Sequence, residues 1–456
     1  MNVLYGLTTP DSGEIIYDGR TVSISGPQDA IKLGIGMVHQ HFMLIPPLTV
    51  AENVILGNEP AGPGGTVDQR AAHETVKRLS REFGLEVPPE AKIEDLSVGL
   101  QQRVEILKAL YRGARLLILD EPTAVLTPQE ADQLFEIIRK LKAEGSAIIF
   151  ITHKLREVMA LADRITVMRR GKVVDTTDPA ASGPADLARL MVGRSVLLQV
   201  DRGPSKPGEP ILELQGIVVE DDRRQPAVNG VDLTVRAGEI VGLAGVTGNG
   251  QNELVEAVAG IRSLKAGKIR LDGRDVTGAS THRRLHAGLS HIAADRHKLG
   301  AILELSVADN IALPDYREPR FARWGVRLFQ AIRDYALELI KSFDIRAESP
   351  DELLGSLSGG NQQKVVVARE LGSEPKVLLA AQPTRGVDVG SIEFIHRQMV
   401  EQRDQGLAVL LVSSELDEIL SLSDRVAVMY QGRIVAELEG RAIDRDRIGL
   451  LMAGGG

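Results

Sequence analysis

The 456-residue sequence contains no cysteine. Disulfide bonds, thiolate metal sites and cysteine nucleophiles are therefore excluded, and secretion gains no support. Long hydrophobic runs are also missing, because the longest, such as residues 115–120, have the length of a strand and fall far below the ~18 residues of a membrane-spanning helix. No signal peptide opens the chain, so we expect a soluble cytoplasmic protein.

The chain lacks an excess of positive charge as well. Its 54 lysines and arginines stand against 62 acidic residues, for a formal net charge of −8. This balance argues against broad binding to nucleic acid or anionic lipid, although it leaves room for one local basic patch. The charged fraction of 25% and the hydrophobic fraction of 43% are those of a globular protein. The length is about three times that of a typical domain, which predicts at least two cores.

The chain carries two copies of one pattern. Matching segments share an offset of 261: 96–110 with 357–371, 116–123 with 377–384, and 150–153 with 411–414. Nearer the start, residues 13–20 match residues 267–274 at an offset of 254. Three matches at one spacing indicate a tandem repeat.

Each copy alternates short β-branched runs with longer helical patterns, which indicates α/β cores with mostly parallel sheets. The predicted strands include residues 147–151, 165–168, 377–380 and 409–412. Residues 201–210 hold three prolines and two glycines, which is typical of an exposed linker. We therefore expect a first domain over residues 1–200, a linker over 201–210 and a second domain over 211–456.

The first copy has no counterpart of residues 211–254. The 254 offset aligns Met1 with Val255, so the first strands and a glycine-rich loop have no equivalent. The opening residues carry no helix cap and resemble the interior of a helix. We expect a truncated or mis-started N-terminus, and a naturally shortened variant is the alternative.

A glycine-rich turn follows the predicted strand 239–244 in the second copy. Its glycines have the spacing of a P-loop, whose backbone N–H groups and helix N-terminus bind phosphate: Gly245, Gly248 and Gly250. Gln251 stands where the phosphate-binding lysine belongs, and Asn252 replaces the hydroxyl residue that would hold Mg²⁺. By itself the loop is weak evidence, and a plain strand-to-helix turn is the alternative.

Two acidic residues end a hydrophobic strand in the first copy. Asp120 can hold the Mg²⁺ shell, and Glu121 can orient or deprotonate an attacking water, as phosphoryl transfer requires. His153, after the next predicted strand, can reach a γ-phosphate. Gln40 follows an earlier strand, where its amide can share a Mg²⁺ ligand or a water. A structural Asp-Glu pair at a strand end is the alternative for Asp120 and Glu121 taken alone.

Together these motifs resemble those of ABC ATPases. Residues 357–363, Leu-Ser-Gly-Gly-Asn-Gln-Gln, resemble the ABC signature, residues 116–123 a Walker B strand, Gln40 a Q-loop and His153 the switch histidine. The resemblance implies an α/β fold of two tandem P-loop NTPase domains. Each would have a mostly parallel sheet core and a helical subdomain.

The closer resemblance is to the tandem ATP-binding subunits of simple-sugar and nucleoside importers. Residues 190–194 and 385–390 look like that group, and residues 37–43 and 124–130 lean toward its nucleoside branch. By this resemblance the chain hydrolyses ATP at the cytoplasmic face of the membrane. It would bind two transmembrane permease subunits, through segments 42–57 and 299–313, and a solute-binding protein indirectly; nucleic acid is not expected as a partner.

The resemblance also implies that each ATP, with its Mg²⁺, lies between the P-loop of one copy and the signature of the other. The first site would then combine residues from both copies: Gln40, Asp120, Glu121, His153, Ser358, Gly359, Gly360 and Gln362. Asp120 and Gln40 would hold the metal. The P-loop of this site would lie upstream of Met1, so we expect the 456-residue chain to be inactive and its first half to be poorly stable.

The second site would be degenerate. It combines the glycine-rich loop of the second copy with the first-copy signature: Gly245, Gly248, Gly250, Gln251 and Asn252 with Ser97 and Gly99. In that signature Val98 replaces a glycine. Ala381, Gln382 and Ser414 stand where Asp, Glu and His would be, and the loss of a general base costs ~10²- to 10⁴-fold in rate. We expect this site at most to hold nucleotide.

Two other functions stay open at this point. One is a soluble tandem ABC ATPase acting on ribosomes, although such proteins are expected to have a long charged helical linker. The other is a non-hydrolysing regulatory pseudo-ATPase, because the better site lacks a P-loop.

Overall fold

The computed structural model describes residues 1–39, 42–62, 64, 66–123, 126, 128–169, 171–193, 200, 202–246, 248–452 and 454. The chain divides into two compact units, residues 1–191 (unit 1) and residues 192–456 (unit 2). Within them, none of the described helices combines the length and apolar character that crossing a membrane requires.

Unit 2 is built on a six-stranded sheet with the strand order β13-β16-β17-β10-β18-β19. The first five strands are parallel: β13 (Leu289–Ile292), β16 (Val377–Ala381), β17 (Ala408–Val412), β10 (Ile240–Ala244) and β18 (Arg425–Tyr430). The edge strand β19 (Arg433–Glu439) is antiparallel to β18. Strands β10, β16 and β17 are buried at every position, as their continuous apolar sequences predict for a sheet covered on both faces.

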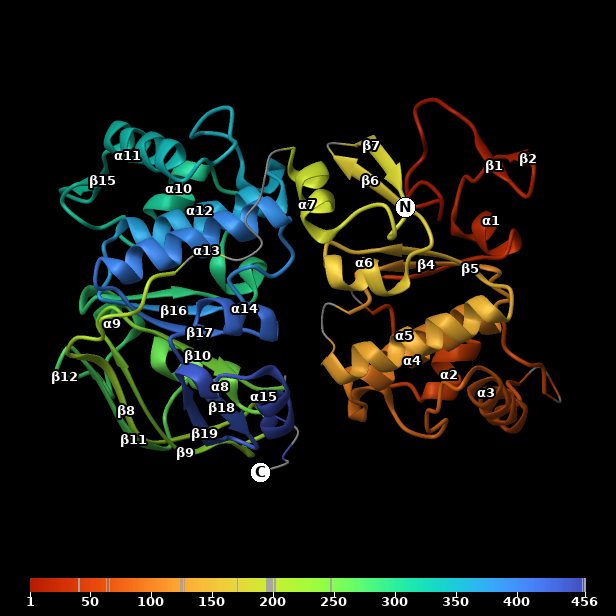
Figure 1. Ribbon diagram of the computed structural model, residues 1–456, viewed down its shortest axis with the longest axis horizontal. Helices are drawn as coiled ribbons and strands as arrows, with labels where there is room; N and C mark the ends of the chain where they lie inside the picture. Colours follow the sequence, from red (N-terminus) through yellow and green to blue (C-terminus); the bar gives the residue numbers. More distant parts are fainter. Residues whose placement is uncertain are drawn as a thin grey trace. The chain divides into compact units, whose positions relative to one another are not determined.

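Two layers cover this sheet (Figure 1). One face packs on helix α8 (Gln251–Ala259) and on an antiparallel sheet of order β12-β11-β8-β9. Its strands are β8 (Pro210–Glu220), β9 (Pro226–Arg236), β11 (Ala266–Leu271) and β12 (Arg274–Asp275). The other face carries helices α12 (Gly359–Gly372), α13 (Val389–Asp404), α14 (Leu416–Leu422) and α15 (Arg445–Met452).

A helical subdomain extends the α12 side of unit 2. It contains α10 (Val307–Ala312) and α11 (Phe329–Ser342), which pack on α12, and the small hairpin of β14 (Ala322–Arg323) and β15 (Val326–Arg327). Helix α9 (Thr281–His286), a five-residue π-helical turn (Arg296–Gly300) and short 3₁₀ turns at Leu354–Ser356 and Gly440–Ala442 complete the unit.

Unit 1 repeats part of this plan. Its central sheet is parallel and three-stranded, with β3 (Ile35–Val38), β4 (Leu116–Asp120) and β5 (Ala147–Ile151) in that order. Two antiparallel hairpins accompany it: β1 (Ile15–Tyr17) with β2 (Arg20–Val22), and β6 (Ile165–Arg169) with β7 (Lys172–Thr177). The helices are α1 (Pro27–Lys32), α2 (Val50–Ile55), α3 (Gln69–Phe83), α4 (Val98–Tyr111), α5 (Pro128–Ala143), α6 (Leu155–Leu161) and α7 (Pro184–Val192), with a 3₁₀ turn at Ile93–Asp95.

The two sheets differ at one strand. In unit 2, β10 lies between β17 and β18 and joins the hairpin β18–β19 to the sheet. In the part of unit 1 that the structure describes, no strand takes the place of β10, so the corresponding hairpin β6–β7 forms a sheet of its own. The glycine-rich loop follows β10 and therefore lies in unit 2. The predicted opening helix is wrong: residues 2–6 form turns, because neither a cap nor sufficient length supports a helix before Gly6.

Local capping interactions fix the ends of two helices in unit 1. Thr49 and Glu52 form a reciprocal capping box at the start of α2, and Asp68 caps α3, which ends at Gly84 in the left-handed conformation (φ 69°). The four strands predicted from β-branched runs are confirmed to within one residue at either end.

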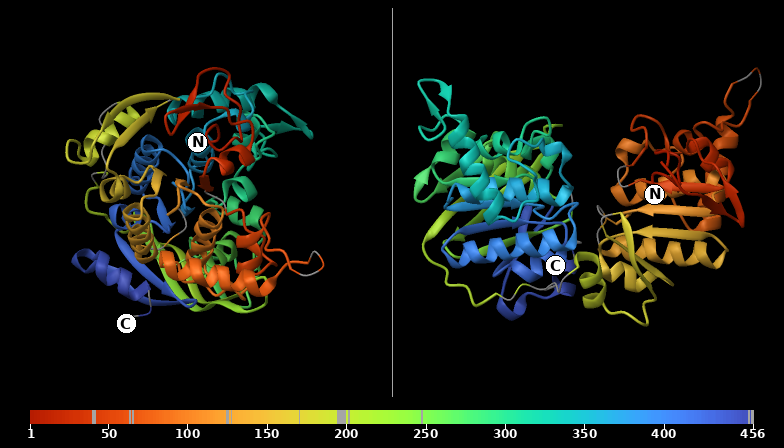
Figure 2. Two further views of the ribbon diagram at one scale, coloured as in Figure 1. Left: turned by 90° about the vertical axis from the view of Figure 1, so that its right-hand side faces the viewer. Right: turned by 90° about the horizontal axis from the view of Figure 1, so that it is seen from above.

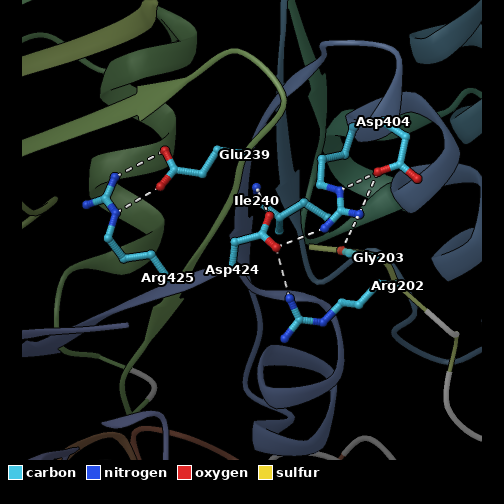
Figure 3. A network of polar contacts seen from close by, with 8 residues as sticks. Arg202, Gly203, Glu239, Ile240, Asp404, Asp424 and Arg425 are labelled. Carbon is cyan, nitrogen blue, oxygen red and sulfur yellow. Dashed lines mark hydrogen bonds and ion pairs between the residues drawn. The ribbon is translucent and has the colours of Figure 1, made fainter. Parts of the chain in front are cut away.

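The proline-rich segment expected as a linker is bound to unit 2 at both ends. Arg202 Nη1 lies 2.9 Å from Asp424 Oδ1, and the Gly203 carbonyl accepts a hydrogen bond of 3.1 Å from Arg403 (Figure 3). At the other end, the Gly208 N–H donates to the Ala237 carbonyl at 2.8 Å, and the Ala237 N–H donates to the Glu209 carbonyl at 2.9 Å. The residues between are mostly exposed, so proline content predicts exposure here without predicting freedom of movement.

Candidate active site

The carboxyl ends of β4 and β5 bring together two of the residues singled out from the sequence. Glu121 follows β4 and His153 follows β5, and because these strands are parallel neighbours their ends meet at one edge of the sheet. His153 Nδ1 lies 2.7 Å from Glu121 Oε1. The Glu121 backbone has a positive φ of 48°, which costs energy in a residue other than glycine and is often found at functional sites.

The free oxygen of Glu121 is suited to a reaction. Among the described residues, Glu121 Oε2 is buried and has no hydrogen-bond partner. The preceding residue, Asp120, is half-buried, and burial together with the neighbouring Glu121 charge raises its pKa. An unpaired buried carboxylate oxygen beside a second carboxylate can bind a cation or accept a hydrogen bond from a polarised water. These residues therefore fit an ATP-bound Mg²⁺.

A third carboxylate, which the sequence patterns did not single out, links the two strand ends. Glu157, in α6, accepts hydrogen bonds from the hydroxyls of Thr123 and Thr152, the latter at 2.8 Å. Thr123 lies two residues after Glu121, and Thr152 immediately precedes His153. The side chain of Glu157 is buried, and that burial raises its pKa. The sequence does contain one signal for Glu157, because the 261 offset aligns it with another glutamate, Glu418.

Unit 2 keeps this geometry with different side chains. Gln382 also has a positive φ, 49°, and its Oε1 accepts a hydrogen bond of 3.0 Å from the Ser414 hydroxyl. Glu418 accepts from Thr384 at 2.7 Å and lies 2.8 Å from His396 Nε2. Ala381 is buried at the end of β16 and offers no ligand. The backbone arrangement of the site is thus repeated in both units, but only in unit 1 are the two residues after the paired strands a glutamate and a histidine.

The glycine-rich loop of unit 2 leads from β10 into α8, as predicted. Gly250 is the N-cap of α8 with a φ of 100°, and a Cβ there would meet the Ala227 carbonyl oxygen at 2.1 Å, so the loop requires glycine. Gly248 also has positive φ. The amide of Gln251 lies against Gly245 and donates a hydrogen bond of 3.2 Å to the Val246 carbonyl. This side chain therefore bonds to its own loop, where a phosphate-binding lysine would extend outward.

The two signature segments begin helices. Ser97 caps α4 and Ser358 precedes the first residue of α12, so both segments place backbone N–H groups at a helix N-terminus, which favours anions. A methyl group added at any of the signature glycines would lie within 3 Å of a neighbouring side chain. That side chain is Glu130 for Gly99, Arg296 for Gly359, and Ser391 and Asp388 for Gly360. Gln362 is buried and donates to the Leu357 carbonyl at 2.9 Å, so it supports the segment from within unit 2.

Some predicted residues cannot be placed. Gln40, proposed from the sequence as a metal and nucleotide contact, lies outside the described residues, as does the side chain of Val98. In the described part of the chain, no three acidic or histidine side chains gather into a metal-binding cluster of their own.

Comparison with known proteins matches the chain to one family over most of its length. The family model described as "ABC transporter" matches residues 1–124 and 228–385. The chain is 50% identical to the glucose import ATP-binding protein of Haloferax volcanii, over 100% of this chain and 88% of that protein. It is 47% identical to the nucleoside import ATP-binding protein NupA of Lactococcus lactis (100% and 90% covered) and 40% identical to a ribose import ATP-binding protein of Rubrobacter xylanophilus (100% and 90%).

The family match extends over both repeats, and each named relative aligns along the whole chain. The strand ends that carry Asp120, Glu121 and His153, the glycine-rich loop and the two helix-starting signatures are the parts expected of an ATP-binding cassette. The chain belongs to the ABC transporter family of ATP-binding proteins, with two ABC ATPase domains in tandem.

Proposed function

We propose that this protein is the ATP-hydrolysing subunit of an importer for sugars or nucleosides, and that it works through separate permease subunits. The similarity to import ATP-binding proteins supports the solute class. The observation that carries hydrolysis is the contact of 2.7 Å between His153 and Glu121 beside Asp120, which leaves one buried carboxylate oxygen of Glu121 open.

Hydrolysis would use the residues of unit 1. Glu121 would orient and deprotonate the attacking water, while His153 would fix the Glu121 carboxylate and contact the transferred phosphate. Asp120 would hold the Mg²⁺ of the nucleotide, with Gln40 as a second ligand. When bound, Mg²⁺ neutralises charge on the phosphate oxygens. The signature residues Ser358, Gly359 and Gly360 would supply N–H donors to the same nucleotide.

The loop of unit 2 would hold nucleotide without hydrolysing it. Gln382 has no base function, Ala381 has no metal ligand, and Gln251 is bonded to the Val246 carbonyl of its own loop. These three features support a division of labour between one hydrolytic site and one binding site. The signature of unit 1, with Ser97 and Gly99, would complete the second.

The catalytic proposal is tested with Glu121→Gln. ATP turnover is measured on the 456-residue chain and on the same chain extended through the reading frame upstream of Met1. In the form that turns over ATP, Glu121→Gln should lower kcat by ~10²-fold or more while nucleotide affinity changes little, because only the water-activating charge is lost. The matched control is Gln382→Ala, the equivalent position of unit 2, which should leave turnover almost unchanged. Equal losses from both changes would mean that both sites hydrolyse ATP.

The permease would dock on equivalent segments of the two units. Ile45 and Ile302 are 39% and 40% exposed, and each is bonded through its backbone to a buried asparagine, Asn53 or Asn310, in the following helix. An exposed isoleucine on a rigid, repeated support fits a protein contact. These residues lie in the segments 42–57 and 299–313, and we propose that the segments bind two permease subunits at the inner face of the membrane.

Docking is tested by site-specific crosslinking from positions 45 and 302 in cells that produce the permease. Crosslinks to permease chains from both positions support the proposal. Crosslinks to ribosomal proteins, with none to a permease, would favour the soluble ATPase instead.

A further inference from the structure

The most exposed large hydrophobic side chain in the described part of unit 2 is that of the only tryptophan of the chain. Trp324 is 93% exposed, at the tip of the hairpin β14–β15. Val326 and Phe329 beside it are 64% and 60% exposed. Residues 323–330 form an unbroken run of exposed positions at the edge of unit 2, where Figure 1 labels β15 and Figure 2 shows the hairpin projecting from the unit. Apolar groups concentrated in this way mark a contact surface.

The turn itself is unfavourable for tryptophan. Trp324 and Gly325 have φ values of 55° and 80°, so both central residues of the two-residue turn lie in the left-handed region. Asparagine, aspartate or glycine suits the first of these positions, whereas a bulky residue is strained there. Folding alone thus gives no reason to place a tryptophan at the tip.

The base of the hairpin is rigid. Phe321 is 2% exposed, and its ring lies 5.3 Å from that of Tyr335 in α11. The guanidinium of Arg320 lies over both rings and pairs with Asp315, and the Leu328 N–H closes the loop on the Phe321 carbonyl at 2.8 Å. The tip is therefore held out from the subdomain on a packed support.

Positive charge surrounds the tip, although the whole chain is acidic. Residues 315–329 contain four arginines and two acidic residues. The acidic groups are engaged, Asp315 with Arg320 and Glu318 with His286, and Arg327 pairs with Asp309. Within the described residues, the exposed Arg317 and Arg323 have no ion-pair partner. These arginines form a local basic patch of the kind that the net charge of the chain does not exclude.

The equivalent segment of unit 1 lacks these residue types. The hairpin segment joins α10 to α11, and the equivalent connection between α2 and α3 spans residues 56–68, which contain no aromatic and no basic residue. The feature is thus specific to unit 2 and is not part of the repeated cassette.

From these observations we propose that the hairpin β14–β15 inserts the Trp324 side chain into the interfacial region of an anionic lipid bilayer, with Arg317 and Arg323 on the lipid headgroups. Tryptophan and arginine together suit this interface, where the ring lies at headgroup depth and cations meet anionic phosphate. The proposal rests on the proposed function, because the hairpin follows the segment 299–313 that would dock on the permease at the membrane.

The unique tryptophan allows a direct test on the full 456-residue chain. Trp324 emission is followed during titration with vesicles of phosphatidylcholine alone, or of phosphatidylcholine mixed with phosphatidylglycerol. We expect a blue shift and quenching by bromine-labelled lipid with the anionic vesicles only, weakened by salt. The double variant Arg317→Gln/Arg323→Gln should bind about 25-fold more weakly, since each arginine at an anionic surface contributes about fivefold.

A matched control is available in the same unit. Arg223 and Arg224 are exposed in the turn between β8 and β9, and Arg223→Gln/Arg224→Gln makes the same charge change on another hairpin. It should leave vesicle binding within about twofold of the parent chain. Co-sedimentation of Trp324→Ala, which removes the reporter, should show weaker binding with an unchanged circular dichroism spectrum.

Three results would overturn the proposal: no emission change with anionic vesicles, equal losses in the two double variants, or a blue shift that requires a permease in the bilayer. The last would identify the hairpin as a protein contact. None of them affects the importer function, which is tested separately by the crosslinks from positions 45 and 302.

Discussion

Asp424 stands at the centre of a buried charge cluster that holds the interdomain segment to unit 2, and its replacement by asparagine tests how that cluster stabilises the unit. Its carboxylate accepts hydrogen bonds from Arg202 at 2.9 Å, Arg403 at 2.8 Å and the Ile240 N–H at 2.9 Å (Figure 3). The side chain of Arg403 is 0% exposed and that of Asp424 is 7% exposed. Asparagine keeps the shape and one acceptor but removes the charge.

The expected cost follows from burial. Removing one partner of a buried ion pair costs about 3–5 kcal/mol, because the other charge stays buried. Arg403 keeps Asp404 and the Gly203 carbonyl as partners, so we expect the lower end, ~3 kcal/mol. In a domain of this size that lowers the unfolding midpoint by roughly 6–12 °C. Arg202→Ala is the control: its side chain is 27% exposed, and a partly exposed pair contributes about 0–1 kcal/mol.

The assay is thermal and urea unfolding, monitored by far-ultraviolet circular dichroism and by the anisotropy of Trp324 emission, which reports on unit 2 alone. Asp424→Asn should shift the unit 2 transition clearly more than Arg202→Ala. If the two variants shifted it equally, the stability would come from pinning the segment and not from the buried Arg403, and the reasoning would be refuted.

Three further predictions concern the sites. Ser358→Arg should reduce ATP turnover by ~10²-fold because it would obstruct the proposed hydrolytic site, whereas Ser97→Arg, at the site proposed to be degenerate, should cost much less. Similar losses in steady-state turnover would contradict the assignment. Glu157→Gln should lower kcat by roughly 10- to 100-fold with little change in KM, because it loosens the loops that hold Glu121 and His153. The equivalent Glu418→Gln should leave turnover nearly intact. An equal effect of the two substitutions would indicate that Glu157 has a purely structural role. Burial acts to raise the pKa of the Glu418 carboxyl, but hydrogen bonding to His396 holds this pKa below its ordinary 4.5. The stabilising contribution of Glu418 is therefore present above pH 4.5 and is lost as the pH falls through the lower pKa of the folded state. Acid unfolding of unit 2 should therefore become less steep in Glu418→Gln, and an unchanged pH profile would show that the Glu418 carboxylate is not responsible.

The sequence by itself determined the tandem repeat, the strands and the residues at their ends. These features are local: apolar β-branched runs must be buried as strands, and the residue after a parallel strand lies at the edge of the sheet. The positions of Asp120, Glu121 and His153 at strand ends could therefore be predicted, whereas their roles came from the resemblance to ABC ATPases. Gln251, Gln382 and Ser414, at the equivalent positions of the second copy, led to the prediction of an altered second site.

Only the tertiary structure showed the contacts between distant segments. Glu157 in α6 joins the loops after β4 and β5 through its hydrogen bonds to Thr123 and Thr152, and its only mark in the sequence is the equivalent Glu418. Arg403 reaches Gly203 across 200 positions of sequence, so a segment that looks like a free linker is fixed. The amide of Gln251 bonds within its own loop, and Trp324, a residue type usually at least partly buried, lies at an exposed hairpin tip. The contacts of Glu157 with Thr123 and of Arg403 with Gly203 depend on where the fold places partners far apart in sequence, and residue type alone does not determine that placement.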